Sequence, residues 1–175
     1  FFSTHPPPPP ILSGLVGSEM CIRDRLGNAA EVAAVLTSTL EGMPLVYSGQ
    51  EAGLNKRLAF FEKDEIEWKE HRLATVYQRL FGLKQENKVM WNGGQGGEVL
   101  RIRTSNDDLV FAFNRQNDMN SLVVIPNLSD VSLKITLNEG MEPSVYTDLF
   151  SGEEMELKAG VELTLDPWGY RVFFR

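Results

Sequence analysis

The hydrophobic period of this chain changes once, near Lys88, and this change limits the possible folds more than any other feature. Before it, apolar residues recur every three or four positions, which is typical of helices packed on one face. After it, short runs suited to strands are separated by turns every ~8–12 residues, which predicts an antiparallel β-sandwich or small barrel over residues 88–175. The expected strands are 99–103, 109–113, 122–125, 131–137, 145–146, 155–157, 161–165 and 170–174.

Two helices are predicted in the first half. The first begins at Asn28, a good N-cap residue, with Glu31 three positions later as in a capping box. It ends at Gly42, because glycine takes the left-handed conformation that ends many helices. The second runs over residues 65–87, with Asp64 as its cap. Its packed face is marked at helical spacing by Leu73, Val76, Tyr77, Leu80, Phe81 and Lys84.

The stretch between these helices reads Gly-Met-Pro-Leu-Val-Tyr-Ser-Gly-Gln-Glu over residues 42–51. Pro44 cannot continue a helix, and the apolar run after it suits a short buried parallel strand over residues 45–47. Gly49 permits a tight turn where this strand would end. In an α/β barrel the active site lies at the ends of the strands, so Gln50 and Glu51 are candidate site residues.

This stretch resembles a motif of the α-amylase family of glycoside hydrolases (family thirteen). In that family a Gly-x-Pro-x-x-x-x-Gly-x-Glu run forms the last barrel strand and the turn after it. Gly42, Pro44, Gly49 and Glu51 match the pattern, and Gln50 is a common occupant of its position. The alternative is an ordinary αβ unit of some other α/β protein.

The resemblance covers about residues 26–175, since the family carries a β domain directly after its barrel. It implies an α/β plus all-β chain. Residues 26–87 would be the helix–strand–helix end of a TIM (β/α)₈ barrel that lacks its N-terminal part, and residues 88–175 the C-terminal β-sandwich domain. It further implies a parent enzyme that hydrolyses α-1,4-glucans such as starch and maltooligosaccharides, with any calcium bound outside this chain. We expect an extracellular or periplasmic location for that enzyme.

No catalytic residue is assigned in this chain. A retaining glycosidase uses two carboxyl groups about 5–5.5 Å apart, and the family adds a third carboxylate in a Phe-x-x-Asn-His-Asp-like motif. No Asn-His-Asp run occurs here, and the resemblance places all three carboxylates upstream of this chain. The chain alone is therefore expected to be inactive, with Gln50 and Glu51 supporting the rim of the substrate cleft.

Three tryptophans, Trp68, Trp91 and Trp168, have aromatic faces suited to pyranose rings. For Trp91 and Trp168, packing in the core or at a rim is the favoured interpretation. A second hypothesis is a non-catalytic carbohydrate-binding β-sandwich module, which predicts starch binding by the isolated chain through exposed tryptophans. The hydrolase-fragment hypothesis predicts little or none.

The first 25 residues do not resemble the rest of the chain. The run from Pro6 through Arg25, which begins with five consecutive prolines, resembles translated sequencing-adapter DNA, and such a segment is excluded from fold reasoning. A polyproline linker and a proline-rich site that recruits a partner are the alternatives. On the adapter interpretation Cys21 and His5 carry no function.

Charge and ligand spacing exclude several classes of site. The formal net charge of −7 provides no basic footprint for nucleic acid. No apolar run approaches the ~20 residues of a membrane span, and a single cysteine allows no internal disulfide. No cluster has the spacing of calcium or zinc ligands. The glycine-rich residues 93–97 are not followed by a predicted helix, so they are predicted to form a flexible hairpin and not a phosphate site.

Overall fold

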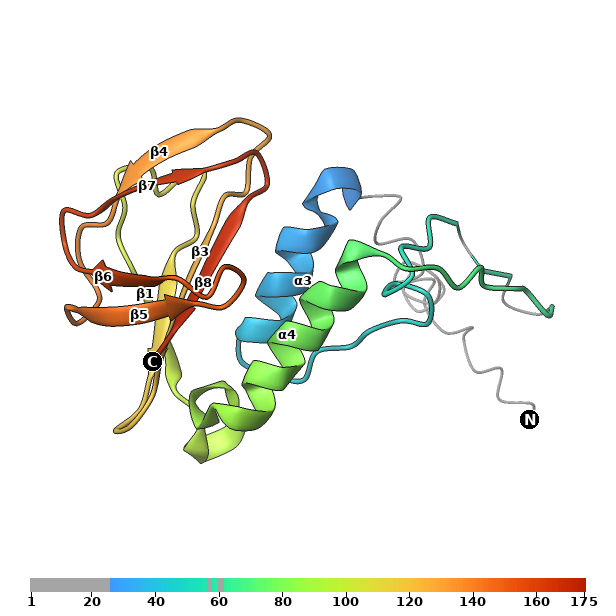
Figure 1. Cartoon of the computed structure of the whole chain (residues 1–175), viewed down its shortest axis with the longest axis horizontal. Helices are drawn as coiled ribbons and strands as arrows, with labels where there is room; N and C mark the ends of the chain where they lie inside the picture. The colour runs from blue at the N-terminus through green and yellow to red at the C-terminus, as the bar shows by residue number, and fades with distance from the viewer. Residues whose placement is uncertain (1–25, 57, 60–61) are drawn as a thin grey trace, which may run out of the picture.

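The computed structural model describes residues 26–56, 58–59 and 62–175 (Figure 1). The predictions for residues 1–25 lie outside this part. Within it the α-helices are α3 (Ala30–Thr39) and α4 (Arg72–Glu86). Neither of them is long and apolar enough to cross a membrane.

Eight strands follow the helices in the described part of the chain. They are β1 (Glu98–Arg101), β2 (Phe113–Gln116), β3 (Ser121–Pro126), β4 (Leu133–Thr136), β5 (Ser144–Asp148), β6 (Glu154–Leu157), β7 (Glu162–Leu165) and β8 (Tyr170–Phe174). Short 3₁₀ helices are η2 (Gly27–Ala29), η3 (Lys88–Met90) and η4 (Gly93–Gln95). The prediction of an antiparallel β domain after Lys88 is confirmed.

The strands form two antiparallel sheets. One has six strands in the order β1-β2-β3-β8-β5-β6, and the other pairs β4 with β7. Strand β3 is buried on both faces because successive side chains point to opposite sides. Val123 and Ile125 enter the core between the two sheets. Leu122 and Val124 enter a second core between the six-stranded sheet and the helices.

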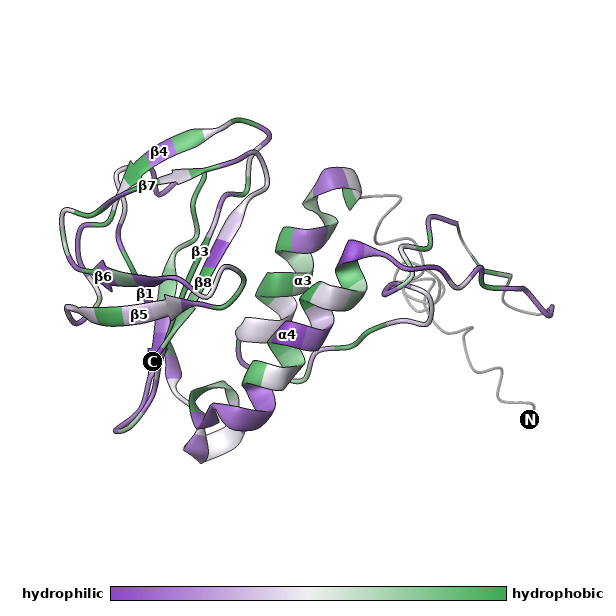
Figure 2. Cartoon of the chain, in the orientation of Figure 1, coloured by the Kyte–Doolittle hydropathy of each residue, from purple (hydrophilic) through white to green (hydrophobic). Residues whose placement is uncertain are grey.

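The result is three layers: the β4–β7 pair, the six-stranded sheet, and the two helices (Figure 1). Helix α3 packs against both α4 and β3. It is hydrophobic over most of its length, whereas α4 alternates between hydrophobic and hydrophilic residues (Figure 2). Such a difference is expected, since a helix covered on two sides needs a wider apolar surface. Val35 of α3 and Leu80 of α4 are both fully buried in the second core.

The predicted remnant of a (β/α)₈ barrel is not evident. Residues 45–47, expected to form a buried parallel strand, form no strand. Met43 and Leu45 are 86% and 74% exposed, so this segment buries little apolar surface. A strand needs neighbouring strands to receive its backbone hydrogen bonds, and the described residues pair none with it.

The predicted helix boundaries are also corrected. Helix α3 begins at Ala30, and its N-cap residue Ala29 provides no side-chain hydrogen bond, so Asn28 is not the cap. Helix α4 begins at Arg72 and not near residue 65, and His71 is its N-cap: the Leu73 amide donates to His71 Nδ1 at 3.1 Å. The charged residues before it have no apolar face to pack, so nothing offsets the entropy of forming a helix there.

Two predictions in the β domain need correction. The expected strand 109–113 is displaced, because β2 begins at Phe113 and includes the buried polar residues Asn114 and Arg115. The glycine-rich segment is not a flexible hairpin. A Cβ atom added at Gly97 would lie 2.6 Å from Val89 Cγ2 and 2.7 Å from the Gln116 backbone nitrogen, so this glycine is required by close packing.

Candidate functional site

The two site residues predicted from sequence, Gln50 and Glu51, both bind the backbone of the turn that contains them. The Tyr47 amide donates to Gln50 Oε1 at 2.7 Å, and the Gly49 amide donates to Glu51 Oε2 at 3.1 Å. Gly49 has φ of 92°, and a Cβ there would lie 3.0 Å from Leu54 Cδ2, so the turn needs glycine. These contacts stabilise a rim-like turn, while its role beside a substrate remains a prediction.

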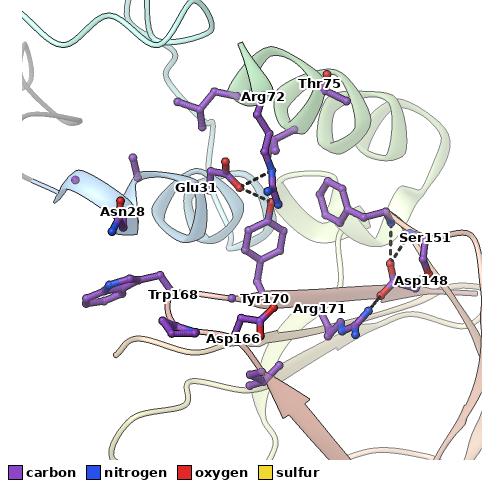
Figure 3. A pocket seen from close by; sticks show the side chains of 18 of the residues that line it. Asn28, Glu31, Arg72, Thr75, Asp148, Ser151, Asp166, Trp168, Tyr170 and Arg171 are labelled. Atoms are coloured by element: carbon purple, nitrogen blue, oxygen red, sulfur yellow. Dashed lines mark hydrogen bonds and ion pairs between the residues drawn. The ribbon is translucent and has the colours of Figure 1, made fainter. Parts of the chain in front are cut away.

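A larger concave site lies elsewhere, between the two helices and the six-stranded sheet. This cleft has a volume of about 850 Å³ and is lined by η2, the first turns of α3 and α4, and the β5–β6 and β7–β8 connections. Figure 3 shows Asn28 and Trp168 at one end, Asp148, Ser151 and Arg171 at the other, and Tyr170 between them. Gln50 and Glu51 are not among its lining residues.

The centre of the cleft is held by a contact between three elements. Glu31 on α3 pairs with Arg72 on α4, with 3.1 Å between Oε2 and Nε. The Tyr170 hydroxyl on β8 donates to the same Glu31 oxygen at 3.2 Å (Figure 3). Burial and the neighbouring Glu31 carboxylate raise the pKa of Tyr170 to about 12, so its hydroxyl keeps its proton at neutral pH.

The carboxylate at the far end belongs to Asp148, which is only 3% exposed. Its Oδ1 accepts from the amides of Phe150 and Ser151 at 2.8 and 2.9 Å, which fixes the turn after β5. Its Oδ2 lies 3.4 Å from Arg171 Nη1. The contacts of Asp148 thus stabilise the fold, and its carboxylate is not placed as one of a pair of reacting carboxyls.

The near end is formed by the turn Asp166-Pro167-Trp168-Gly169, closed by a 2.8 Å hydrogen bond from the Gly169 amide to the Asp166 carbonyl. Trp168 has φ of 54°, the only positive φ at a non-glycine residue in the described part of the chain. Proline second and positive φ third define a type II turn, in which glycine or asparagine usually takes the third position. A bulky residue there costs on the order of 1–3 kcal/mol.

The cleft depends on the helices being fixed to the sheet, and Arg115 on β2 contributes polar contacts that do this at the end of α3. Its side chain is buried, and its residue is 1% exposed. Nη1 donates to the Thr39 carbonyl at the end of α3 at 2.9 Å, Nε to Gly97 at 2.8 Å, and Nη2 to Trp91 at 3.2 Å. Burial lowers the pKa of the Arg115 guanidinium, and the Glu41 carboxylate acts against this shift.

The arrangement suits binding better than bond cleavage. Two of the three carboxylates that line the cleft, Glu31 and Asp148, are each paired with an arginine. Within the described ranges, no group of three or more His, Cys, Asp or Glu side chains is placed to hold a metal ion. The cleft therefore offers hydrogen-bonding groups and the aromatic side chains of Phe150, Trp168 and Tyr170, with little net charge.

The tryptophans fall into three different environments. Trp91 donates from its indole nitrogen to the Lys84 carbonyl at 3.0 Å, and the Lys88 ammonium lies 5.6 Å from its ring, so the packing prediction fits it. Trp68 is 63% exposed. Trp168 lines the cleft, whereas the interpretation favoured from the sequence was packing in the core or at a rim. The Pro-Trp-Gly order could have identified this position from the sequence, since it puts tryptophan where a type II turn favours glycine.

Comparison with known proteins places the β domain in a family. Residues 100–172 match the family model for the maltogenic amylase C-terminal domain. Over 129 residues the chain is 30% identical to α-amylase MalA of Haloarcula japonica, an alignment that covers 71% of this chain and 18% of that protein. The chain thus spans about a fifth of the length of this relative.

Solved structures share the fold. A noncanonic maltogenic α-amylase, AmyB of Thermotoga neapolitana, superimposes with a TM-score of 0.71 at 15% identity, over 85% of this chain and 36% of that one. The α-amylase of Geobacillus thermoleovorans gives 0.63 at 17% identity, over 84% and 33%. The matched domain and the sequence relative identify this chain as a homologue of the α-amylase family of glycoside hydrolases, and the solved structures show that it shares their fold.

Proposed function

We propose that this chain is the C-terminal part of an α-amylase-type glycosidase that hydrolyses α-1,4-glucans with retention of anomeric configuration. The observation that carries this proposal is the match to a C-terminal amylase domain, together with 30% identity to an α-amylase of which the alignment covers 18%. The catalytic carboxylates would come from the remainder of the parent enzyme. The substrate would be starch or maltooligosaccharides, with an extracellular or periplasmic location and any calcium outside this chain.

Exposed apolar side chains support an origin of residues 26–87 at the end of a catalytic barrel. Met43 and Leu45 are 86% and 74% exposed on either side of Pro44. Strands of a parallel barrel are buried on both faces, so the packed barrel interior and the surrounding helices would cover such side chains. In that setting the turn braced by Gln50 and Glu51 would lie at the carboxyl end of a strand, where active-site loops are found.

Inactivity of the isolated chain follows from the two-carboxyl requirement of retaining hydrolysis. One carboxyl group attacks the anomeric carbon while the other protonates the leaving oxygen, and the two lie about 5–5.5 Å apart. In the cleft, Asp148 Oδ1 already accepts two backbone amides, and Glu31 Oε2 binds Arg72 and Tyr170. Both carboxylates are therefore already engaged in contacts within the protein.

The test compares the full parent enzyme with this chain on maltoheptaose, following the newly formed anomer by proton NMR. We expect the parent enzyme to release the α-anomer first and the chain to show no turnover above buffer. A parent enzyme that releases the β-anomer, or that does not cleave α-1,4-glucans, would contradict the proposal. Turnover by the purified chain would contradict the assignment of the catalytic groups to the remainder of the enzyme.

The alternative, a carbohydrate-binding module without catalysis, is favoured by one observation: Trp68 is 63% exposed on the segment before α4. This alternative expects retention of the chain on insoluble starch, lost in Trp68→Ala. If Trp68→Ala is retained as well as the unchanged chain, Trp68 does not bind starch.

A further inference from the structure

Trp168 occupies a backbone position that its side chain disfavours. Its φ of 54° is the conformation that a type II turn requires after proline, and glycine would adopt it without strain. The next residue is Gly169, whose φ is not positive. The glycine of this turn therefore follows the strained position and does not occupy it. Strain of this kind is concentrated at binding and catalytic sites, which makes the position a candidate.

Buried groups next to the turn hold it in place through hydrogen bonds, so the strained φ of Trp168 is retained. Asn127 is fully buried, and its Nδ2 donates to the carbonyls of Val131 and Asp166 at 2.7 and 2.8 Å. The Trp168 amide donates to the Ser129 carbonyl at 2.8 Å, and the Asn127 amide donates to Gly169 at 2.8 Å. These bonds fix the direction in which the indole leaves the backbone.

Packing does not account for Trp168. Its side chain belongs to none of the three hydrophobic clusters found among the described residues, and it is neither buried nor fully exposed. It instead lines the cleft, with Asn28 above it at the same end (Figure 3). A half-exposed aromatic ring on a rigid turn is the arrangement expected of a stacking surface for a flat ligand.

The charges of the cleft define the ligand chemistry. Its carboxylates are Glu31, Asp148 and Asp166, and the first two are neutralised by Arg72 and Arg171. A strongly charged ligand therefore gains little here. A neutral ligand with many hydroxyl groups can stack on the indole and bind the amide and carboxylate groups around it, and a volume of about 850 Å³ lies within the usual range of ligand sites.

We propose that this cleft is a binding site for a short α-glucan (the Trp168 site), in which a pyranose ring stacks on Trp168 and hydroxyl groups bind Asn28 and Asp166. The choice of an α-glucan rests on the proposed function, whereas the cleft and the strained turn of Trp168 are observed in the described residues. The proposal departs from the sequence-based expectation that a hydrolase fragment binds little or no starch.

The first experiment titrates maltotriose into the full 175-residue chain and follows it by calorimetry and by indole NMR signals. We expect saturable binding with Kd on the order of 1 mM. Trp168→Gly should keep the fold, because glycine accepts the backbone angle, and should weaken binding at least tenfold. Trp168→Phe should retain part of the affinity. Met119→Ala, which changes an exposed side chain outside the cleft, should bind as the unchanged chain does.

Two results would overturn the proposal. One is the absence of saturation up to about 20 mM maltotriose. The other is a folded Trp168→Gly variant that binds within twofold of the unchanged chain. Equal affinity for cellotriose would overturn the assignment to α-glucans. Thermal melts of each variant show whether it is folded, and Trp168→Phe retains an aromatic ring if the glycine variant does not fold.

Failure of this proposal and failure of the proposed function give different results. If the parent enzyme does not cleave α-1,4-glucans but the chain binds maltotriose through Trp168, the Trp168 site stands and the hydrolase assignment falls. If the parent enzyme cleaves maltoheptaose and Trp168→Gly changes neither binding nor the retention of the enzyme on insoluble starch, the proposal of the Trp168 site falls alone.

Discussion

The β domain and the segment between the two helices differ in how fully they contain their own partners. Every strand from β1 to β8 pairs within the chain, and both faces of β3 are covered. Residues 43–47 have the composition of a strand but pair with none of the described strands, and Met43 and Leu45 are largely exposed. Local sequence therefore determines structure only where the contacts that stabilise it are present in the same chain.

The largest effects should come from the two cores, and they test whether these cores are independent. Leu137 is fully buried between the sheets, and Leu80 is fully buried between α4 and the sheet. Replacing either by alanine should lower the free energy of unfolding by about 3–4 kcal/mol. In hydrogen exchange, Leu137→Ala should expose the amides of both sheets. Leu80→Ala should release the helices first.

The comparison between the two regions fails if Leu80→Ala removes the protection of β4 and β7 as fully as Leu137→Ala does. In that case the helices and the sandwich unfold as one unit, and the β domain does not fold alone. Chemical denaturation followed by circular dichroism gives the matching free energies for both variants.

Arg115→Met should lower the free energy of unfolding by about 3 kcal/mol. The methionine leaves buried carbonyl groups of Thr39 and Gly97 without their charged donor. Arg103→Met is the matched control, because the Arg103 side chain is 66% exposed and forms an ion pair with the partly exposed Asp107. Urea unfolding measures both, and a loss below about 1 kcal/mol for Arg115→Met would show that apolar packing alone fixes the helices.

Gly97→Ala should cost about 2 kcal/mol, since its Cβ would overlap Val89 and the Gln116 backbone. Gly94→Ala is the control in the same glycine-rich segment, because no heavy atom lies within 4 Å of the added Cβ. Thermal unfolding of the two variants should differ clearly. Equal melting temperatures would restore the interpretation of this segment as a flexible hairpin.

The smallest effect is a loss of stability confined to alkaline pH. The pKa of Tyr170 is about 12 in the folded protein, against 10.0 for an ordinary tyrosine. The stabilisation from its neutral hydroxyl is therefore complete below pH 10 and is lost as the pH rises from 10 towards 12. Tyr170→Phe should reduce this loss relative to neutral pH. If the two proteins have parallel stability curves between pH 9 and about 12, Tyr170 does not cause it.

Sequence patterns predicted the β domain well because each of its strands pairs with another strand of the same chain. The alternation around Ile135 and Leu137 identified one strand and its buried face correctly. Strand β2 was misplaced because its buried side chains include Asn114 and Arg115, which hydrophobic patterning counts as exposed. No local rule shows that an arginine will be satisfied by carbonyl groups from three distant segments.

The site was harder to predict than the fold. Glu31 was expected to cap a helix, but it instead joins Arg72 and Tyr170 across the cleft, a contact between residues far apart in the sequence. The start of α4 was placed too early because charged residues with good helix propensity precede it. Propensity alone does not form a helix where no apolar face is available to pack.

The Arg115 contacts also determine how the protein transmits movement. Apolar surfaces can slide past one another at little cost, but a guanidinium holds its donors in one plane and in fixed directions. The end of α3, the segment around Trp91 and strand β2 are therefore constrained to shift together. We therefore expect strand β2 to follow the end of α3 whenever the helices are displaced.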